Sequence, residues 1–323
     1  MSAKMKQLGE NNFRDMMKKR VLPFLRENRK SGYFRSFDGT PIYYEYYKNP
    51  RDKASIVISH GFCEFTGKYD EVAYYLYRQG YSVFLFDYRG HGKSGRHLRN
   101  LSKVYISSYN EYVGDLKEYT KQIVKRESTS GKIVLFAHSM GGAIGALTIE
   151  RYPELFNCAI MASPMLEISF GELSNNMIRI LALVATGLRW KKRYAYGQKP
   201  FSGVPDLEGS GSVSKARYMY VFEKRLRNKR YQTSGATYGW SLATIKAIRR
   251  LQSDAASVRI PILLLQAEKD NIVKPNGQIE FAKKARSVKL ISIKDAKHEI
   301  YNGNYAMRSV FYRSIFHFLK EQC

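Results

Sequence analysis

Short apolar runs alternate with helical patterns from residue 33 almost to the end of the chain. The apolar runs are typical of buried strands and cover 33–37, 42–47, 55–59, 82–86, 133–137, 159–162, 262–266 and 289–293. Helical patterns separate most of them, at 69–79, 109–126, 140–151, 275–286 and 304–320. Strands that alternate with helices predict a mostly parallel sheet covered by helices on both faces. Asp38-Gly39, between the first two runs, predicts a hairpin and so an antiparallel edge.

The alternation stops over residues 164–257, which are rich in Arg, Lys, Tyr and Trp and helical in parts. An insertion of this length between two strands predicts a mainly helical cap over the carboxyl ends of the strands, where such sheets bind ligands. We therefore expect a core formed by 33–163 and 258–323 and a cap insertion at 164–257. The apolar run at 177–188 is too short to span a bilayer. Its interpretations are a helix packed in the core, the lining of an acyl channel, or a helix at the membrane interface.

Residues 1–32 form a basic segment ahead of the strands. Within it, apolar residues recur near helical spacing over 13–30, which predicts an amphipathic helix that Pro23 kinks or ends. Its apolar positions are Phe13, Met16, Met17, Val21, Phe24 and Leu25. A basic amphipathic helix suits packing on the protein or lying on a membrane surface, and the pattern leaves both open.

The charge of the chain indicates a polyanionic partner. Its 54 Lys and Arg residues against 28 Asp and Glu residues give a formal net charge of +26. Residues 1–35 hold ten basic residues against three acidic ones, and residues 165–250 hold sixteen against five. An anionic membrane surface and nucleic acid are the candidate partners, and a merely soluble basic surface is the plain alternative. Because the basic, aromatic-rich cap matches no recognition motif for nucleic acid, we expect a membrane instead.

The cysteines and the N-terminus bear on the compartment. Cys63, Cys158 and Cys323 are too few and too widely spaced for a disulfide framework or a metal site. The N-terminus lacks the apolar core of a secretion signal, and the chain has no apolar stretch long enough for a membrane-spanning helix. We therefore expect a cytoplasmic protein associated peripherally with the inner face of the cell membrane.

A candidate nucleophile follows the strand predicted at 133–137. This strand leads into the letters HSMGG at 138–142 and then into a helical pattern. A strand, a sharp turn carrying serine and a helix form a nucleophile elbow, in which the serine hydroxyl points out of the sheet. The crowded turn needs small residues two places before and after the serine, and Ala137 and Gly141 meet this need, although glycine is more usual at the first place. We expect Ser139 to be the nucleophile.

Serine needs a base that an acid holds in place, and in folds of this kind the chain order is serine, acid, histidine. Asp270 lies just beyond the strand predicted at 262–266 and is the expected acid, with Glu268 as its rival. His298 lies on the loop after the last strand of the predicted sheet, and of six histidines it alone combines this order with a strand end. We therefore predict a catalytic triad of Ser139, Asp270 and His298.

An oxyanion formed on the substrate needs two donors, usually backbone N–H groups. The N–H of Met140 follows the nucleophile, and the N–H of Phe62 lies in the loop after the strand at 55–59. The residues that flank these donors and the serine are expected to line the substrate site: His60, Gly61, His138 and Gly141.

These motifs together resemble the family of bacterial lysophospholipases and monoacylglycerol lipases within the α/β-hydrolases. The segments that carry the resemblance occur in one order: HGF at 60–62, DYRGHGKS at 87–94, AHSMGG at 137–142, Asp270 with IV at 272–273, and HEI at 298–300. It covers residues from about 33 to 320, and segments at 238–240, 263–268 and 306–310 look closest to lysophospholipases associated with the bacterial inner membrane. The resemblance implies an α/β-hydrolase fold, a serine mechanism, and neither a metal nor an organic cofactor.

The expected activity is hydrolysis of a single-chain lipid ester, with a lysophospholipid as the first candidate and an acyl-enzyme on Ser139 as intermediate. Monoacylglycerol or another carboxylic ester, and acyl transfer, are alternatives that use the same residues. A peptide N-terminus is disfavoured, because few carboxylates stand in the basic cap to bind its ammonium group; they are Glu167, Glu172, Asp206, Glu208 and Glu223. A non-catalytic membrane-binding protein on a hydrolase fold is the alternative from another class. The pattern gives no oligomeric state.

Overall fold

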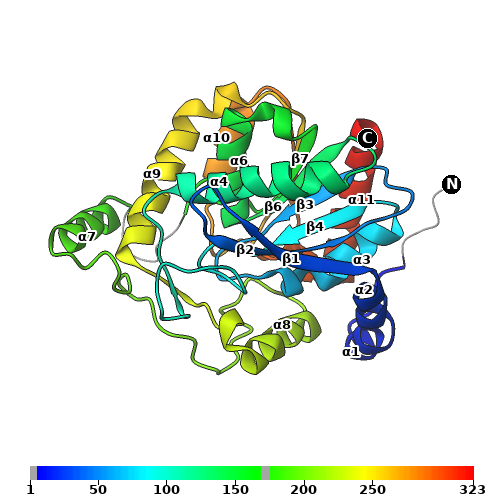
Figure 1. Cartoon of the computed structure of the whole chain (residues 1–323), viewed down its shortest axis with the longest axis horizontal. Helices are drawn as coiled ribbons and strands as arrows, with labels where there is room; N and C mark the ends of the chain where they lie inside the picture. The colour runs from blue at the N-terminus through cyan, green and yellow to red at the C-terminus, as the bar shows by residue number, and fades with distance from the viewer. Residues whose placement is uncertain (1–5, 169–174) are drawn as a thin grey trace.

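The structure, a computed structural model, describes residues 6–168 and 175–323. Glu172 of the cap therefore lies outside the described residues. Within the described ranges, eight strands form one sheet in the order β1-β2-β4-β3-β6-β7-β9-β10 (Figure 1). They are β1 (Arg29–Arg35), β2 (Pro41–Tyr47), β3 (Ser55–Ser59), β4 (Ser82–Phe86), β6 (Ile133–His138), β7 (Cys158–Ala162), β9 (Ile262–Ala267) and β10 (Val288–Ile293). Neighbours from β4 to β10 pair in parallel, whereas β2 is antiparallel to both β1 and β4.

Helices cover both faces of this sheet. One face carries α4 (Tyr109–Tyr119), α6 (Met140–Arg151), α9 (Tyr238–Asp254) and α10 (Pro275–Lys284), and the other carries α3 (Asp70–Arg78) and α11 (Tyr305–Gln322). The short α5 (Lys125–Glu127) continues from α4 through a π-helical turn. Each face has its own hydrophobic core, so strands such as β3, β4, β6, β7 and β9 are buried along their whole length. The predicted α/β class is confirmed.

The antiparallel edge begins earlier than the sequence predicts. The hairpin turn at 38–39 is present, with Gly39 at a φ of 80°. However, β1 begins at Arg29, within the stretch interpreted as helix. The first residues of this edge strand are exposed or only partly buried, so they carry no apolar alternation, and pairing with β2 alone makes them a strand.

The N-terminal segment packs on the body of the protein. It consists of α1 (Phe13–Met16), a π-helical turn and α2 (Leu22–Asn28). The apolar side chains of Phe13, Met17, Val21 and Leu25 are at most 3% exposed, in the core that includes α3 and α11. The apolar face is therefore already covered, which leaves only the basic face for a membrane. Pro23 does not end the helix, because the wider π-helical turn just before it accommodates the missing N–H.

The cap insertion contains α7 (Asn175–Gly187), α8 (Lys215–Arg227), α9 and the two-residue strand β8 (Gly235–Ala236), which pairs with β5 (Lys103–Val104). Of these, α9 packs against α6 and joins the layer that covers the sheet. By contrast, α7 stands at the edge of the molecule beside α9 (Figure 1). Its apolar side chains are 37–60% exposed at Met177, Ile180, Leu181, Leu183 and Val184. The described part of α7 is therefore not a helix packed in the core.

A buried group of charges ties α8 to the core. The guanidinium of Arg217 on α8 donates to both oxygens of Glu71 on α3, each at 2.7 Å, and to the carbonyl of Leu8 at 3.1 Å. Arg308 on α11 donates to the same Leu8 carbonyl at 2.9 Å. Glu10 in turn accepts from Ser214 at the start of α8. These contacts fix α8, and with it one wall of the cap insertion, to α3, α11 and the N-terminal segment.

Candidate active site

Ser139 occupies a strained turn between β6 and α6. Its φ of 53° and ψ of −119° lie outside the regions that residues with a Cβ normally adopt. Backbone hydrogen bonds hold the turn, among them those from Ser139 N–H to the Ala162 carbonyl at 3.2 Å and from Met165 N–H to the Ser139 carbonyl at 2.9 Å. Gly141 allows the turn to lie close against β3, because a Cβ at this position would be 2.1 Å from the Ser59 carbonyl oxygen. This is the geometry of a nucleophile elbow.

Asp270 and His298 form a buried pair at the neighbouring strand ends. Asp270 lies three residues beyond β9, and His298 lies in the loop after β10. The Nδ1 of His298 is 2.7 Å from Oδ2 of Asp270, and these side chains are 5% and 3% exposed, respectively. The other carboxylate oxygen of Asp270 accepts from the N–H groups of Ile272 and Val273 at 2.9 and 3.0 Å. Asp270 is thus oriented by its own loop and can hold the proton of His298 on Nδ1, which directs Nε2 to act as the base.

The environment of Asp270 keeps it ionised. Burial by itself raises the pKa of its carboxyl group, but the hydrogen bond and charge of His298, with the two backbone N–H groups, bring the pKa below its ordinary value. An ionised partner stabilises the imidazolium that forms when His298 takes a proton.

Glu268, the rival acid, points elsewhere. It is exposed, and its carboxylate accepts from the N–H of Asp295 at 2.8 Å. The pairing with His298 therefore favours Asp270.

Sheet order brings the serine and the histidine to one place. The strands β6, β7, β9 and β10 are consecutive and parallel, so the loops that follow them leave the same edge of the sheet. His138, next to the serine, lies against His298 with ring centroids 4.8 Å apart. Ser139 and His298 are only 6% and 4% exposed, and this burial shields the hydrogen bond between His298 and Asp270 from water.

The two expected oxyanion donors lie at the start of α6 and in the turn after β3. Met140 is the first residue of α6, and the N–H groups of a first helical turn have no partner within the helix. Phe62 is half-buried, with its ring 4.2 Å from that of Trp240 on α9. The next residue, Cys63, has a φ of 59°, so the chain turns sharply just after Phe62.

The rings of His60 and His138 hold neighbouring loops in place through contacts with polar groups. His60 Nε2 accepts from the N–H of Tyr88 at 3.0 Å, so its proton lies on Nδ1, which donates to the Gly61 carbonyl at 2.8 Å. Burial lowers the pKa of His60, which favours this neutral form. His138 is fully buried, with Nδ1 3.2 Å from Glu64. These contacts favour a role in which both rings hold their loops in position rather than contact the substrate. Gly61 and Gly141 allow the backbone to lie close to neighbouring groups.

Sequence reasoning missed a buried charge centre beneath the expected oxyanion loop, residues 60–63. The Glu64 carboxylate receives Gly61 N–H at 2.7 Å, Lys68 Nζ at 2.6 Å, the Tyr69 hydroxyl at 2.5 Å and the Tyr301 hydroxyl at 3.3 Å. Lys68 also donates to Glu299, the neighbour of His298, at 2.5 Å. Glu299 accepts from Ser212 of the cap insertion at 2.6 Å and from Asn302 at 2.7 Å. This Glu64–Lys68–Glu299 centre joins the expected oxyanion loop, the loop that carries His298 (the histidine loop) and the cap insertion.

The charges of this centre stabilise one another. Burial raises the pKa of Glu64, but the charges of Lys68 and His138 outweigh it and leave the pKa well below its ordinary value. Burial lowers the pKa of Lys68, and Glu299 and Glu64 more than reverse this. The only sequence hint was a glutamate and a lysine four residues apart after the oxyanion loop, a spacing that is common on protein surfaces.

Among residues 6–168 and 175–323, no group of three or more His, Cys, Asp or Glu side chains could hold a metal ion. In the same residues, no helix is both long and apolar enough to cross a bilayer.

A strained serine after β6, with an aspartate–histidine pair after later strands of a mostly parallel sheet, places this chain among the α/β-hydrolases. The chain belongs to the family described as "Serine aminopeptidase, S33", whose pattern matches residues 50–304, and it is a hydrolase.

Named relatives agree with this assignment. The chain is 29% identical over 297 residues to lysophospholipase L2 of Escherichia coli K12, which covers 90% of this chain and 87% of that protein. It is 26% identical over 276 residues to monoacylglycerol lipase of Mycolicibacterium smegmatis, covering 84% and 88%. The solved structure of Paleococcus ferrophilus monoacylglycerol lipase superposes with a TM-score of 0.69 at 21% identity, over 87% of this chain and 99% of that one, which shows the shared fold.

Proposed function

We propose that this protein is a serine carboxylic-ester hydrolase that releases the fatty acid from a single-chain lipid, with a lysophospholipid as its substrate. The observation that carries the proposal is the strained Ser139 at the same sheet edge as the Asp270–His298 pair. The likeness to lysophospholipase L2, which extends over 90% of the chain, supports the choice of lipid.

In the proposed mechanism, Ser139 Oγ attacks the ester carbonyl carbon while His298 Nε2 takes the hydroxyl proton. The negative charge that develops on the carbonyl oxygen is stabilised by the N–H groups of Phe62 and Met140. The intermediate collapses as the bond to the alcohol oxygen breaks, and the alcohol takes the proton from His298. The acyl group is left on Ser139.

Water completes the turnover in the reverse sense. His298 removes a proton from a water molecule, the hydroxide adds to the acyl carbonyl, and Ser139 leaves with the proton that His298 returns. The products are a fatty acid and the free enzyme. Asp270 stays ionised throughout and holds the imidazole in one orientation, in keeping with its lowered pKa.

We further propose that the protein works at the inner, anionic face of the cell membrane. The exposed apolar side chains of α7 suit the membrane interface, and Arg189, Lys191, Lys192 and Arg193 follow directly on this helix. The N-terminal segment adds exposed Lys18, Lys19 and Arg20. Each basic residue near an anionic surface contributes about 1 kcal/mol before screening by salt.

Monoacylglycerol is the second candidate substrate, favoured by the likeness to monoacylglycerol lipases. Peptide N-termini are less suited to this cap. Of its described carboxylates, Glu167 lies 3.7 Å from Lys274, and Glu223 pairs with Arg14 and Arg227, so both are engaged by cations. A substrate ammonium group that used either of these two carboxylates would have to displace its partner.

The test is release of fatty acid from lysophosphatidylcholine, lysophosphatidylglycerol and monoacylglycerol by the purified protein and by Ser139→Ala. We expect Ser139→Ala to lower kcat by about 10⁴-fold or more, as for other serine hydrolases. The ranking of the three lipids then identifies the substrate class. Equal inactivity of both proteins on all three would defeat the lipid proposal. In that case, labelling of Ser139 by a fluorophosphonate would show that the protein is a serine hydrolase with another substrate. Absence of labelling would favour a non-catalytic binding protein.

A further inference from the structure

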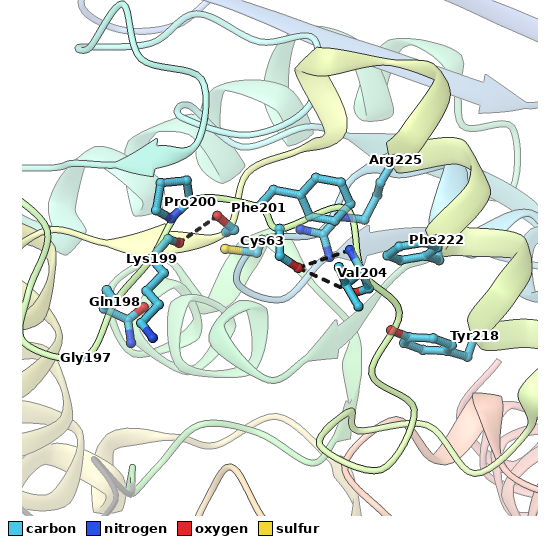
Figure 2. Close-up of a pocket in the computed structure, with 12 residues that line it drawn as sticks. Cys63, Gly197, Gln198, Lys199, Pro200, Phe201, Val204, Tyr218, Phe222 and Arg225 are labelled. Carbon is cyan, nitrogen blue, oxygen red and sulfur yellow. Dashed lines mark hydrogen bonds between the residues drawn. The ribbon is translucent and has the colours of Figure 1, made fainter.

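A cavity of about 470 Å³ lies between the oxyanion loop and the cap insertion. Figure 2 shows Cys63 between the loop that carries Lys199 and Pro200 and the helix α8, which supplies Tyr218, Phe222 and Arg225. Its other lining residues are Gly197, Gln198, Phe201, Ser202, Val204 and Ser234. A volume of this size is within the usual range of sites for small ligands.

The position of this cavity relates it to the reaction. Cys63 directly follows Phe62, whose N–H is the proposed oxyanion donor, and neighbouring Cα atoms are about 3.8 Å apart. A group bound in the cavity would therefore contact the residue next to the proposed oxyanion donor. An ester carries an acyl chain on one side of its carbonyl and an alcohol on the other, so the cavity suits one of these two parts.

The chemistry of the lining selects the alcohol part. Lys199 and Arg225 supply positive charge, and Gln198, Ser202 and Ser234 supply neutral polar groups. Among the described residues that line the cavity, none is Asp or Glu. Burial raises the pKa of the Cys63 thiol to about 12, so the thiol is neutral and adds no negative charge. A cationic, polar cavity is poorly matched to an acyl chain and well matched to an anion.

One of the two cations is held in a fixed orientation. Arg225 donates from Nε to the Tyr231 carbonyl at 3.2 Å and from Nη2 to the Thr233 carbonyl at 2.8 Å. Its guanidinium lies 4.4 Å from the centre of the Phe201 ring. Neither hydrogen bond neutralises its charge. Glu299, whose charge also acts on Arg225, is already bound by Lys68. Lys199, by contrast, is exposed, so its ammonium group is free to close over a ligand.

We propose that this cavity is a headgroup subsite that binds the phosphodiester of a lysophospholipid through Lys199 and Arg225. The proposal rests on the proposed function and adds to it the reason why a phospholipid is preferred to a neutral monoacylglycerol. The acyl chain would lie on the other side of the carbonyl.

The experiment compares 1-palmitoyl lysophosphatidylglycerol with 1-palmitoylglycerol, which share an acyl chain, in neutral detergent micelles at fixed ionic strength. In Lys199→Glu we expect KM for the phospholipid to rise about tenfold, as for loss of a charge-assisted contact, with kinetics on the neutral lipid within twofold of wild type. Lys229→Glu, which reverses an exposed cap charge that does not line the cavity, is the matched control. Because Lys199 is exposed, its replacement should not disturb folding. The headgroup proposal is overturned if Lys199→Glu leaves the ratio of KM for the two lipids unchanged, or if it changes that ratio no more than Lys229→Glu does.

A binding measurement tests the proposed subsite independently of the proposed catalytic function. Calorimetry on Ser139→Ala should detect sn-glycerol 3-phosphate, with affinity about tenfold lower when Lys199→Glu is added. If the ligand binds but the wild-type protein cleaves neither lipid, the phosphate site is supported and the proposed function is rejected. Inorganic phosphate that binds as tightly as the glycerol ester would overturn the headgroup assignment in favour of a simple anion site. Absence of binding, with both lipids hydrolysed, would overturn the subsite and leave the hydrolase.

Discussion

The edge of the sheet that carries Ser139 and the helix α7 are built in opposite ways. At the sheet edge, buried charged groups are paired: Asp270 is bound by His298, and Glu64 and Glu299 are bridged by Lys68. On α7, apolar side chains such as Ile180 and Val184 are 60% and 55% exposed. A buried, fully paired network holds atoms in one arrangement, whereas an exposed apolar surface is suited to a partner that covers it. The first region suits chemistry and the second suits an interface.

Of the variants that compare these two regions, one that replaces the acid of the proposed triad should have the largest effect on turnover. We expect Asp270→Asn to lower kcat by about 10⁴-fold, because an amide holds the histidine in the wrong tautomer and cannot stabilise its cation. Glu268→Gln is the matched control and should keep wild-type turnover, since that side chain is exposed and bonded to Asp295 N–H. Steady-state fatty-acid release measures both. A severe loss in Glu268→Gln with a mild one in Asp270→Asn would reverse the assignment.

A single added methyl group should destabilise the protein more at the close-packed nucleophile turn than at the end of α7. Gly141→Ala places a Cβ 2.1 Å from the Ser59 carbonyl, and we expect it to lower the free energy of unfolding by about 3 kcal/mol. Gly187→Ala, at the end of α7, meets no atom within 4 Å, and we expect a change within about 0.5 kcal/mol. Urea unfolding of both variants tests the contrast. Equal stabilities would mean that the turn is not packed as described.

The Glu64–Lys68–Glu299 centre should affect turnover without taking part in the chemistry. In Lys68→Met the oxyanion loop and the histidine loop lose their shared cation, and a small displacement of reacting groups costs about 10²-fold in kcat. KM should change little, and Lys68→Arg should restore most of the activity, because it keeps the charge between the two carboxylates.

A matched control separates positioning from general stability. Glu71→Gln removes an equally buried carboxylate that binds Arg217 and Arg308 away from the two loops. It should lower the melting temperature and leave kcat near wild type when measured well below that temperature. If Lys68→Met behaves like Glu71→Gln, the centre is structural only.

The smallest effect concerns the surface of α7. We expect Ile180→Ser with Val184→Ser to weaken partition onto vesicles with anionic lipid about tenfold, from loss of roughly 1–2 kcal/mol of apolar burial. Hydrolysis of a short, water-soluble ester should not change. Leu226→Ser, which alters an apolar side chain of α8 with 48% exposure, is the matched control. Vesicle sedimentation at two salt concentrations checks this, and equal partition of all three proteins would remove α7 from the proposed membrane surface.

Much of the core could be predicted because its signals are local. The predicted strands at 55–59 and 82–86 coincide with β3 and β4, and the helix at 140–151 coincides with α6, since buried strands and amphipathic helices carry their pattern in their own residues. Ser139, Asp270 and His298 were singled out because parallel strands bring their carboxyl-end loops to one edge. The start of β1 was missed, because an exposed edge strand owes its structure to pairing with β2.

By itself, the sequence determined the α/β class, the elbow around Ser139 and the order of the candidate catalytic residues. Only the tertiary structure decided that the N-terminal apolar face packs on the protein, that the apolar side chains of α7 face outward, and that Lys68 bridges Glu64 and Glu299. The physical reason is the range of the interactions. Backbone geometry and periodicity act over a few residues, whereas burial and the pairing of charges depend on segments such as 64–68 and 299 that meet only after the chain has folded.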